Sequence, residues 1–101
     1  MSNQKLTRQQ RYLIGAEEEC LEVGQRISKA LLFGIDEVQE GQPLNNRERL
    51  IYEFNDLCTM MELALGYPIG MLIDKDMMQL KREKFEKYLQ YSKSLGLLEG
   101  E

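Results

Sequence analysis

The sequence predicts an all-α protein, a bundle of three to four helices, on three observations. Hydrophobic residues make up 43% and charged residues 30% of the 101 positions, a balance typical of a soluble globular protein rather than a disordered one. The chain is rich in Leu, Glu, Lys, Met and Gln, which favour helices, and it contains only two prolines. Apolar residues recur at helical spacing in three segments that glycine or proline separates. This length predicts a single domain over residues 1–101.

The first predicted helix begins after Thr7, which forms a capping-box pattern with Gln10, and runs to about Phe33 before Gly34. Gly24 lies inside it, which predicts a kink or a close helix contact there. The inward side of this helix is predicted to consist of Tyr12, Ala16, Val23, Ile27 and Ala30.

The second predicted helix covers residues 46–65. Asn45 and Glu48 form another capping-box pattern, and Gly66 ends the helix shortly before Pro68. The preceding residues 34–45 contain two glycines and a proline and are long for a helix connection. Such a loop either lies over a site or is merely a mobile connection, and the sequence leaves both open.

The third predicted helix begins at Met71 or Asp74 and runs to Ser94, ahead of Gly96. Lys81 and Lys84 fall on the same stripe as its apolar residues, where an ordinary amphipathic pattern would place hydrophobic side chains. They either extend along the surface with their charged ends in water or bind phosphate.

Composition excludes several classes of function. The net charge of −4 argues against nonspecific nucleic-acid binding, and no apolar run has the length of a membrane span. We expect a cytoplasmic protein in which Cys20 and Cys58 are reduced and at least partly buried, Cys20 serving as a small hydrophobic side chain. The absence of histidine rules out a Cys/His zinc site and a Ser-His-Asp triad. Metal chemistry must therefore use oxygen ligands, which suit Mg²⁺ or Mn²⁺.

Two acidic pairs predict such a metal site. Glu19 and Glu22 are three residues apart on the first helix, and Glu53 and Asp56 repeat that spacing on the second. Four carboxylates on or beside packing faces repel one another unless a divalent cation binds them. The competing interpretation, that each pair is part of a solvated helix surface, is common for acids at this spacing. Glu17 is predicted to be a surface residue without a role.

The surrounding motifs resemble a known family. Glu18-Glu19-x-x-Glu22 followed by Glu53-x-x-Asp56 is similar to the signature of the all-α nucleoside triphosphate pyrophosphohydrolases, the MazG-like superfamily. The resemblance to small phage and bacterial members extends from about Glu17 to Gly96. It also includes Gln25-Arg26-Ile27-Ser28-Lys29-Ala30-Leu31, Gly41-Gln42-Pro43, Arg49-Leu50 and Lys84-Phe85-x-Lys87-Tyr88-Leu89.

This resemblance implies Mg²⁺-dependent cleavage of a nucleoside triphosphate to a monophosphate and pyrophosphate. It implies Glu19, Glu22, Glu53 and Asp56 as metal ligands, with Glu18 as an accessory acid that helps a second metal or positions water. It also implies helical bundles completed by assembly into a homodimer or homotetramer.

Substrate contacts are predicted on the first and third helices. Lys84 matches a family lysine near the phosphates, and Lys87 a position that is often basic, whereas Lys29 and Lys81 follow from their helix positions alone. Tyr88 is one of several aromatic residues able to stack on a base. The alternative function is a noncatalytic helical nucleotide-binding or regulatory protein that retains the fold.

Overall fold

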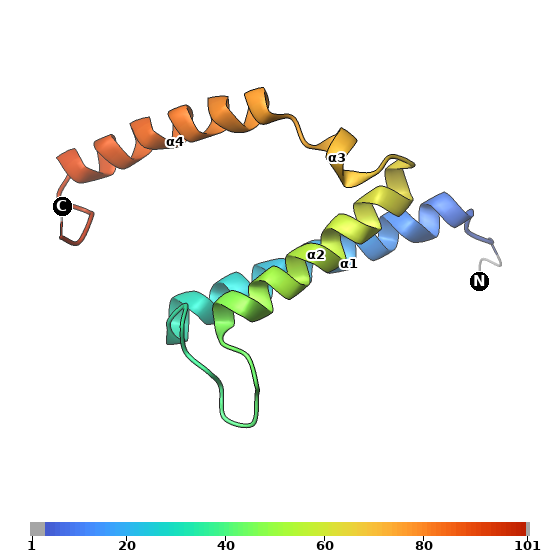
Figure 1. Cartoon of the computed structure of the whole chain (residues 1–101), viewed down its shortest axis with the longest axis horizontal. Helices are drawn as coiled ribbons and strands as arrows, with labels where there is room; N and C mark the ends of the chain where they lie inside the picture. The colour runs from blue at the N-terminus through green and yellow to red at the C-terminus, as the bar shows by residue number, and fades with distance from the viewer. Residues whose placement is uncertain (1–3, 101) are drawn as a thin grey trace. The chain divides into compact units, whose positions relative to one another are not determined.

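The computed structural model describes residues 4–100, and every regular element within them is a helix (Figure 1). The helices are α1 (Arg8–Phe33), α2 (Asn46–Leu65), the single turn α3 (Ile69–Leu72) and α4 (Lys75–Ser94). The all-α prediction is thereby confirmed, while α3 was not anticipated. The chain divides into two compact units, the first ending at Gly70 and the second beginning at Met71.

The predicted helix starts are confirmed. The Thr7 hydroxyl accepts a hydrogen bond from the Gln10 amide at 3.0 Å, and the Gln10 side chain accepts one from the Thr7 amide at 2.8 Å. Asn45 and Glu48 form the same reciprocal pair at the start of α2. At the start of α4 one oxygen of Asp74 accepts from the amides of Asp76 and Met77. These bonds satisfy backbone donors that the first helical turn leaves without a partner.

The predicted helix ends are also found. Gly34 follows α1 at a φ of 105°, and Gly66 follows α2 in the left-handed conformation at a φ of 78°. Residues other than glycine rarely adopt such backbone angles, so glycine allows each of these two helices to end where it does.

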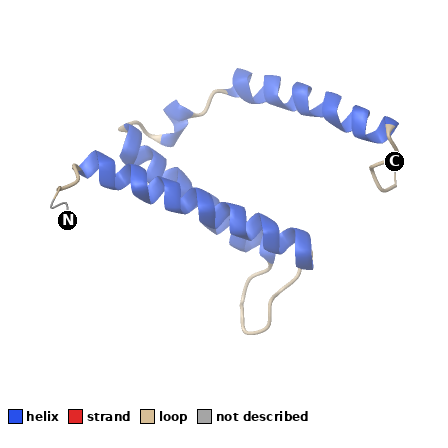
Figure 2. Ribbon diagram, turned by 180° about the vertical axis from the view of Figure 1, so that it is seen from behind, coloured by secondary structure: helices blue, strands red, loops and turns tan. Residues whose placement is uncertain are grey.

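Within the first unit, α1 and α2 form a hairpin and lie side by side along most of their length (Figures 1 and 2). Asn46, which is 2% exposed, secures the connection between them. Its side-chain amide donates to the Gly34 carbonyl at 2.8 Å and to a Glu37 carboxylate oxygen at 3.0 Å. The amide of Arg47 also donates to the carbonyl of Ile35 at 2.8 Å. The loop is therefore fixed to the start of α2 at its base.

The close helix contact, one of the two alternatives predicted at Gly24, occurs at Gly15 instead. A Cβ at Gly15 would lie 2.7 Å from Cε of Met60, whereas a Cβ at Gly24 would meet no atom within 4 Å. Gly15 is buried and Gly24 exposed. The missing side chain at Gly15 thus makes room for Met60 of α2.

We predict that Gly24→Ala will raise the free energy of unfolding by about 0.5–1 kcal/mol, because alanine restricts the unfolded chain and its Cβ enters open space. Chemical denaturation monitored by circular dichroism measures this change. Gly15→Ala is the matched control. Its free energy of unfolding should rise less, because the added Cβ would lie too close to Met60, whose side chain must then move. A loss of stability in Gly24→Ala would instead mean that another molecule covers this face of α1.

The buried apolar core is small. Among the described residues the buried hydrophobic side chains are Ala16 and Ala64, at 5% and 2% exposure. Ile27, predicted to face inward, is 45% exposed, and Phe54 of α2 is 53% exposed. Cys20 is exposed and Cys58 half-buried, so the prediction of a buried side chain at Cys20 is wrong for this chain. No helix of residues 4–100 combines the length and the apolar character that membrane crossing requires.

Candidate metal centre

Three of the predicted acids come together between α1 and α2. Glu19 from α1 and Glu53 and Asp56 from α2 each offer a carboxylate oxygen, and these oxygens lie within 4.8 Å of one another. Glu19 and Glu53 are half-buried, and Asp56 is exposed. The group is therefore built by two helices and opens to solvent on one side.

The register of the hairpin explains this arrangement. The two helices run in opposite directions and are in contact at Gly15 and Met60. Four residues further along α1 is Glu19, and four residues back along α2 is Asp56. The next step of three residues reaches Glu22 on α1 and Glu53 on α2. Steps of three and four residues keep to one face of a helix, so the acids follow the line of contact between the helices.

The electrostatics of the group are unfavourable without a cation. Desolvation between the helices raises the pKa of Glu19 above its ordinary value of 4.5, and the negative charges of Asp56, Glu53, Glu22 and Glu18 raise it further. Within residues 4–100 the one ion pair joins Arg47 to Asp36 at 3.2 Å, so no basic side chain forms a salt bridge with these acids. A divalent cation bound between these carboxylates would replace their mutual repulsion with attraction to the ion.

The ligand chemistry fits a hard cation. Mg²⁺ prefers about six oxygen ligands, usually keeps several waters and takes the remainder from carboxylates and phosphates. Glu19, Glu53 and Asp56 would supply up to three protein oxygens and leave positions for water or substrate. Mn²⁺ accepts the same ligands.

The other acids of the first motif lie around this group. Glu22 is exposed and is not within 4.8 Å of all three clustered oxygens, although its charge acts on Glu19. Glu18 is exposed next to Glu19 on α1. Glu17 is exposed, as predicted for a surface residue.

Lys29 lies away from the carboxylates. It is ten residues beyond Glu19 on α1, about 15 Å along the helix axis. Its ammonium group is 5.8 Å from the centre of the Phe33 ring, and its side chain lines a cavity of about 200 Å³ with Glu37, Gln39 and Asn46. A contact of Lys29 with a metal-bound phosphate stays a prediction.

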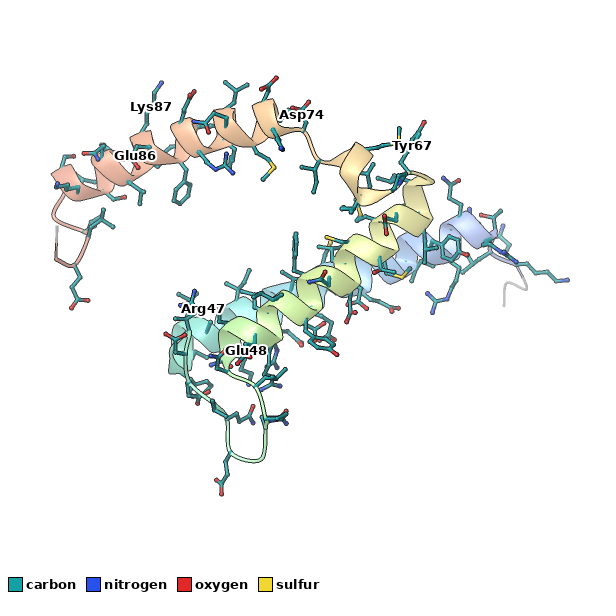
Figure 3. All side chains as sticks on the ribbon, viewed as in Figure 1. Arg47, Glu48, Tyr67, Asp74, Glu86 and Lys87 are labelled. Carbon is teal, nitrogen blue, oxygen red and sulfur yellow. The ribbon has the colours of Figure 1, made fainter. Side chains whose placement is uncertain are left out.

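The remaining predicted substrate contacts belong to the second unit. Lys81, Lys84, Lys87 and Tyr88 all lie on α4 with exposed side chains. Figure 3 shows Lys87 projecting from this helix. Their roles stay predictions that follow from the resemblance and the helix pattern.

A cavity beside Glu53 was not predicted. It measures about 260 Å³, and its walls come from the loop and the first two turns of α2. The lining residues are Gln42, Pro43, Leu44, Arg49, Tyr52 and Glu53. Figure 3 shows Arg47 and Glu48 at the start of the same helix. The signal for this cavity was the glycine- and proline-containing loop, whose position beside the acids depends on the hairpin register.

Comparisons with known proteins identify no relative. No family model matches the chain, and neither a curated protein nor a solved structure does. The likeness to the MazG-like superfamily therefore depends on the resemblance of the motifs alone.

Proposed function

We propose that this protein is a Mg²⁺-dependent nucleoside triphosphate pyrophosphohydrolase of the MazG-like type, acting on dNTPs or NTPs for nucleotide pool control or housecleaning. The observation that carries the proposal is the group formed by Glu19, Glu53 and Asp56, whose carboxylate oxygens come within 4.8 Å from two helices. All three of these residues belong to the acids that the family motifs single out.

In this proposal the residues divide between metal and water. Glu19, Glu53 and Asp56 would hold the cation. Glu22, about one helical turn further along α1, would add negative charge beside it. The bound cation would neutralise phosphate charge and polarise the phosphoryl oxygens. Glu18, exposed beside Glu19, orients the attacking water and accepts its proton.

The reaction is a hydrolysis at the α-phosphorus. Water adds its oxygen to this phosphorus, and the bond to the oxygen that bridges the α and β phosphates breaks. The products are a nucleoside monophosphate and pyrophosphate. Basic side chains reduce the charge of the leaving pyrophosphate, the role proposed for Lys84 and Lys87.

A nucleotide panel tests the function. The full chain is incubated with each dNTP and NTP in Mg²⁺, and the products are separated by ion-exchange chromatography. We expect a monophosphate and pyrophosphate in equal amounts from at least one nucleotide. Release of a diphosphate and orthophosphate would overturn cleavage between the α and β phosphates. Absence of turnover with every nucleotide would leave the noncatalytic binding protein as the better description.

The proposal includes assembly into a homodimer or homotetramer. Large apolar side chains of the hairpin are exposed, with Leu31 at 82% and Leu32 at 73%. Others are Leu21, Ile51 and Phe54. Exposed apolar side chains favour association when a second copy can cover them, since burial of apolar surface is the main driving force of assembly. Light scattering coupled to gel filtration should give a mass two or four times that of the 11.8 kDa chain; a mass of one chain would contradict this part of the proposal.

A further inference from the structure

The contact line between α1 and α2 continues past the acids into two arginines. Arg26 follows Glu22 by four residues, and Arg49 precedes Glu53 by four. Each arginine is also seven residues, about two helical turns, from the other acid of its own helix. The register that places Glu22 level with Glu53 therefore places Arg26 level with Arg49. The pair of acids Glu22 and Glu53 is therefore followed, one helical turn further along the helix contact, by the pair of arginines Arg26 and Arg49.

Arg26 has an unsatisfied buried donor. Its side chain is half-buried, and Nη1 is inaccessible to solvent and has no hydrogen-bond partner within the described part of the chain. A guanidinium carries five N–H donors and no acceptor. Leaving a charged donor buried without an acceptor is unfavourable. An oxygen atom of a bound ligand could accept the hydrogen bond from Nη1 that the hairpin leaves unmade.

Arg49 is held in place and opens to a cavity. Its Nη1 donates to the side-chain oxygen of Gln39 at 3.0 Å, which ties it to the loop. The same side chain lines the 260 Å³ cavity beside Tyr52 and Glu53. Arg49 and Glu53, one of the three clustered acids, therefore line the same cavity.

The arginines do not serve to neutralise the acids by direct pairing. Arg26 is spaced four residues from Glu22, which suits an ion pair on a helix, yet within residues 4–100 neither arginine forms a salt bridge. A purely structural role would predict such pairs. Guanidinium groups bind phosphate oxygens through two parallel hydrogen bonds, a geometry available to an arginine that is not already paired.

We propose that Arg26 and Arg49 form the anion-binding half of the contact line and bind the non-bridging oxygens of a polyphosphate chain. This inference rests on the proposed function, because the neighbouring carboxylates repel a polyphosphate unless they hold a divalent cation. The acids then bind the cation, the arginines bind the phosphates, and the chemical class of ligand is a metal-complexed di- or triphosphate.

The test separates anion binding from metal binding. Binding of inorganic tripolyphosphate in the presence of Mg²⁺ is measured by isothermal titration calorimetry on the full chain. Binding of Mn²⁺ without any anion is measured separately by electron paramagnetic resonance. The variants are Arg26→Gln, Arg26→Lys and Arg49→Gln. Arg11→Gln is the control, since Arg11 is an exposed arginine of the same helix.

We expect Arg26→Gln and Arg49→Gln each to weaken tripolyphosphate binding about tenfold or more, with Mn²⁺ affinity unchanged or higher. Arg26→Lys should recover part of the loss, because it keeps the charge but loses the paired donors. Arg11→Gln should bind as the wild type does. An anion affinity within twofold of wild type in Arg26→Gln would overturn the inference, and so would a wild type that binds no tripolyphosphate. Anion and Mn²⁺ affinity falling together would overturn it as well, because that result assigns the arginines a structural role.

Nucleotide turnover separates this inference from the proposed function. If no nucleotide is hydrolysed but tripolyphosphate binding depends on Arg26, the site holds polyphosphate and the enzymatic proposal fails alone. If nucleotides are hydrolysed and Arg26→Gln changes neither the KM nor tripolyphosphate affinity, the enzymatic proposal stands and this inference fails.

Discussion

A Glu53→Gln protein should hydrolyse its best nucleotide with a kcat/KM at least about 100-fold below that of the wild type, because a ligand of the cation loses its charge. Glutamine keeps the size of the side chain and one carbonyl oxygen, so the hairpin should fold as before. Glu53 offers one of the three carboxylate oxygens that lie within 4.8 Å of one another, and the residue also lines the cavity beside the loop. Steady-state kinetics over a range of Mg²⁺ concentrations measures the effect. The apparent Mg²⁺ requirement should rise in parallel with the loss of rate.

Glu17→Gln is the matched control for this experiment. It removes the same charge from the same acidic segment, but Glu17 is exposed and lies outside the metal group. Its kcat/KM should stay within twofold of wild type. If Glu53→Gln keeps more than a tenth of the activity, Glu53 is not a metal ligand. If Glu17→Gln loses as much activity as Glu53→Gln, the acidic segment acts through its total charge rather than through a coordinated ion.

The ends of the helices could be predicted because their causes are local. A capping box such as Thr7 with Gln10 needs only four consecutive residues, and the glycines after α1 and α2 adopt backbone angles that other residues avoid. The short α3 was missed because a single turn has no period to detect. The one sequence feature that favoured a helix start there was Pro68, which directly precedes α3.

The metal group could be predicted only in part. The spacing of each acidic pair was visible, but the two members of a pair point about 60° apart on a helix. Which member approaches the other helix is decided by the packing register. That register depends on the contact of Gly15 with Met60, two residues that neither acidic motif includes. Both acids of the second pair therefore join the group, whereas Glu22 does not.

The exposure of apolar residues could not be read from the sequence for a related reason. A periodic pattern identifies the apolar side of a helix, but it does not identify the molecule that covers this side. Cys20 and Ile27 illustrate the limit, since both belong to helical patterns that favour burial and both are exposed in the single chain. Within the proposed assembly, a second copy would provide the missing cover.

Glu19→Gln should make the metal-free protein more stable to heat, although it removes a proposed metal ligand. The pKa of Glu19 is raised, so the folded state binds this proton more tightly than the unfolded state does. Stability then falls as the pH increases from the ordinary value of 4.5 through the raised pKa, and the full penalty applies above it. At pH 7.5 in EDTA, replacing the charged carboxylate with a neutral amide removes this penalty. Calorimetry in EDTA between pH 4.5 and 7.5 should show that the difference in Tm between Glu19→Gln and the wild type grows as the pH rises.

Adding Mg²⁺ should make the wild type more stable to heat than Glu19→Gln, the reverse of the order expected in EDTA. A ligand that binds only the folded state stabilises it by about 2.7 kcal/mol at a concentration 100 times its Kd, so the wild type should gain several degrees in Tm. Glu19→Gln lacks one of the clustered carboxylates and should gain little from the same Mg²⁺. Glu17→Gln should follow the wild type in both buffers, since its charge lies outside the group. A Glu19→Gln protein that is less stable than wild type in EDTA would show that Glu19 contributes a favourable contact to the fold. Equal Mg²⁺ shifts in the two proteins would remove Glu19 from the set of metal ligands.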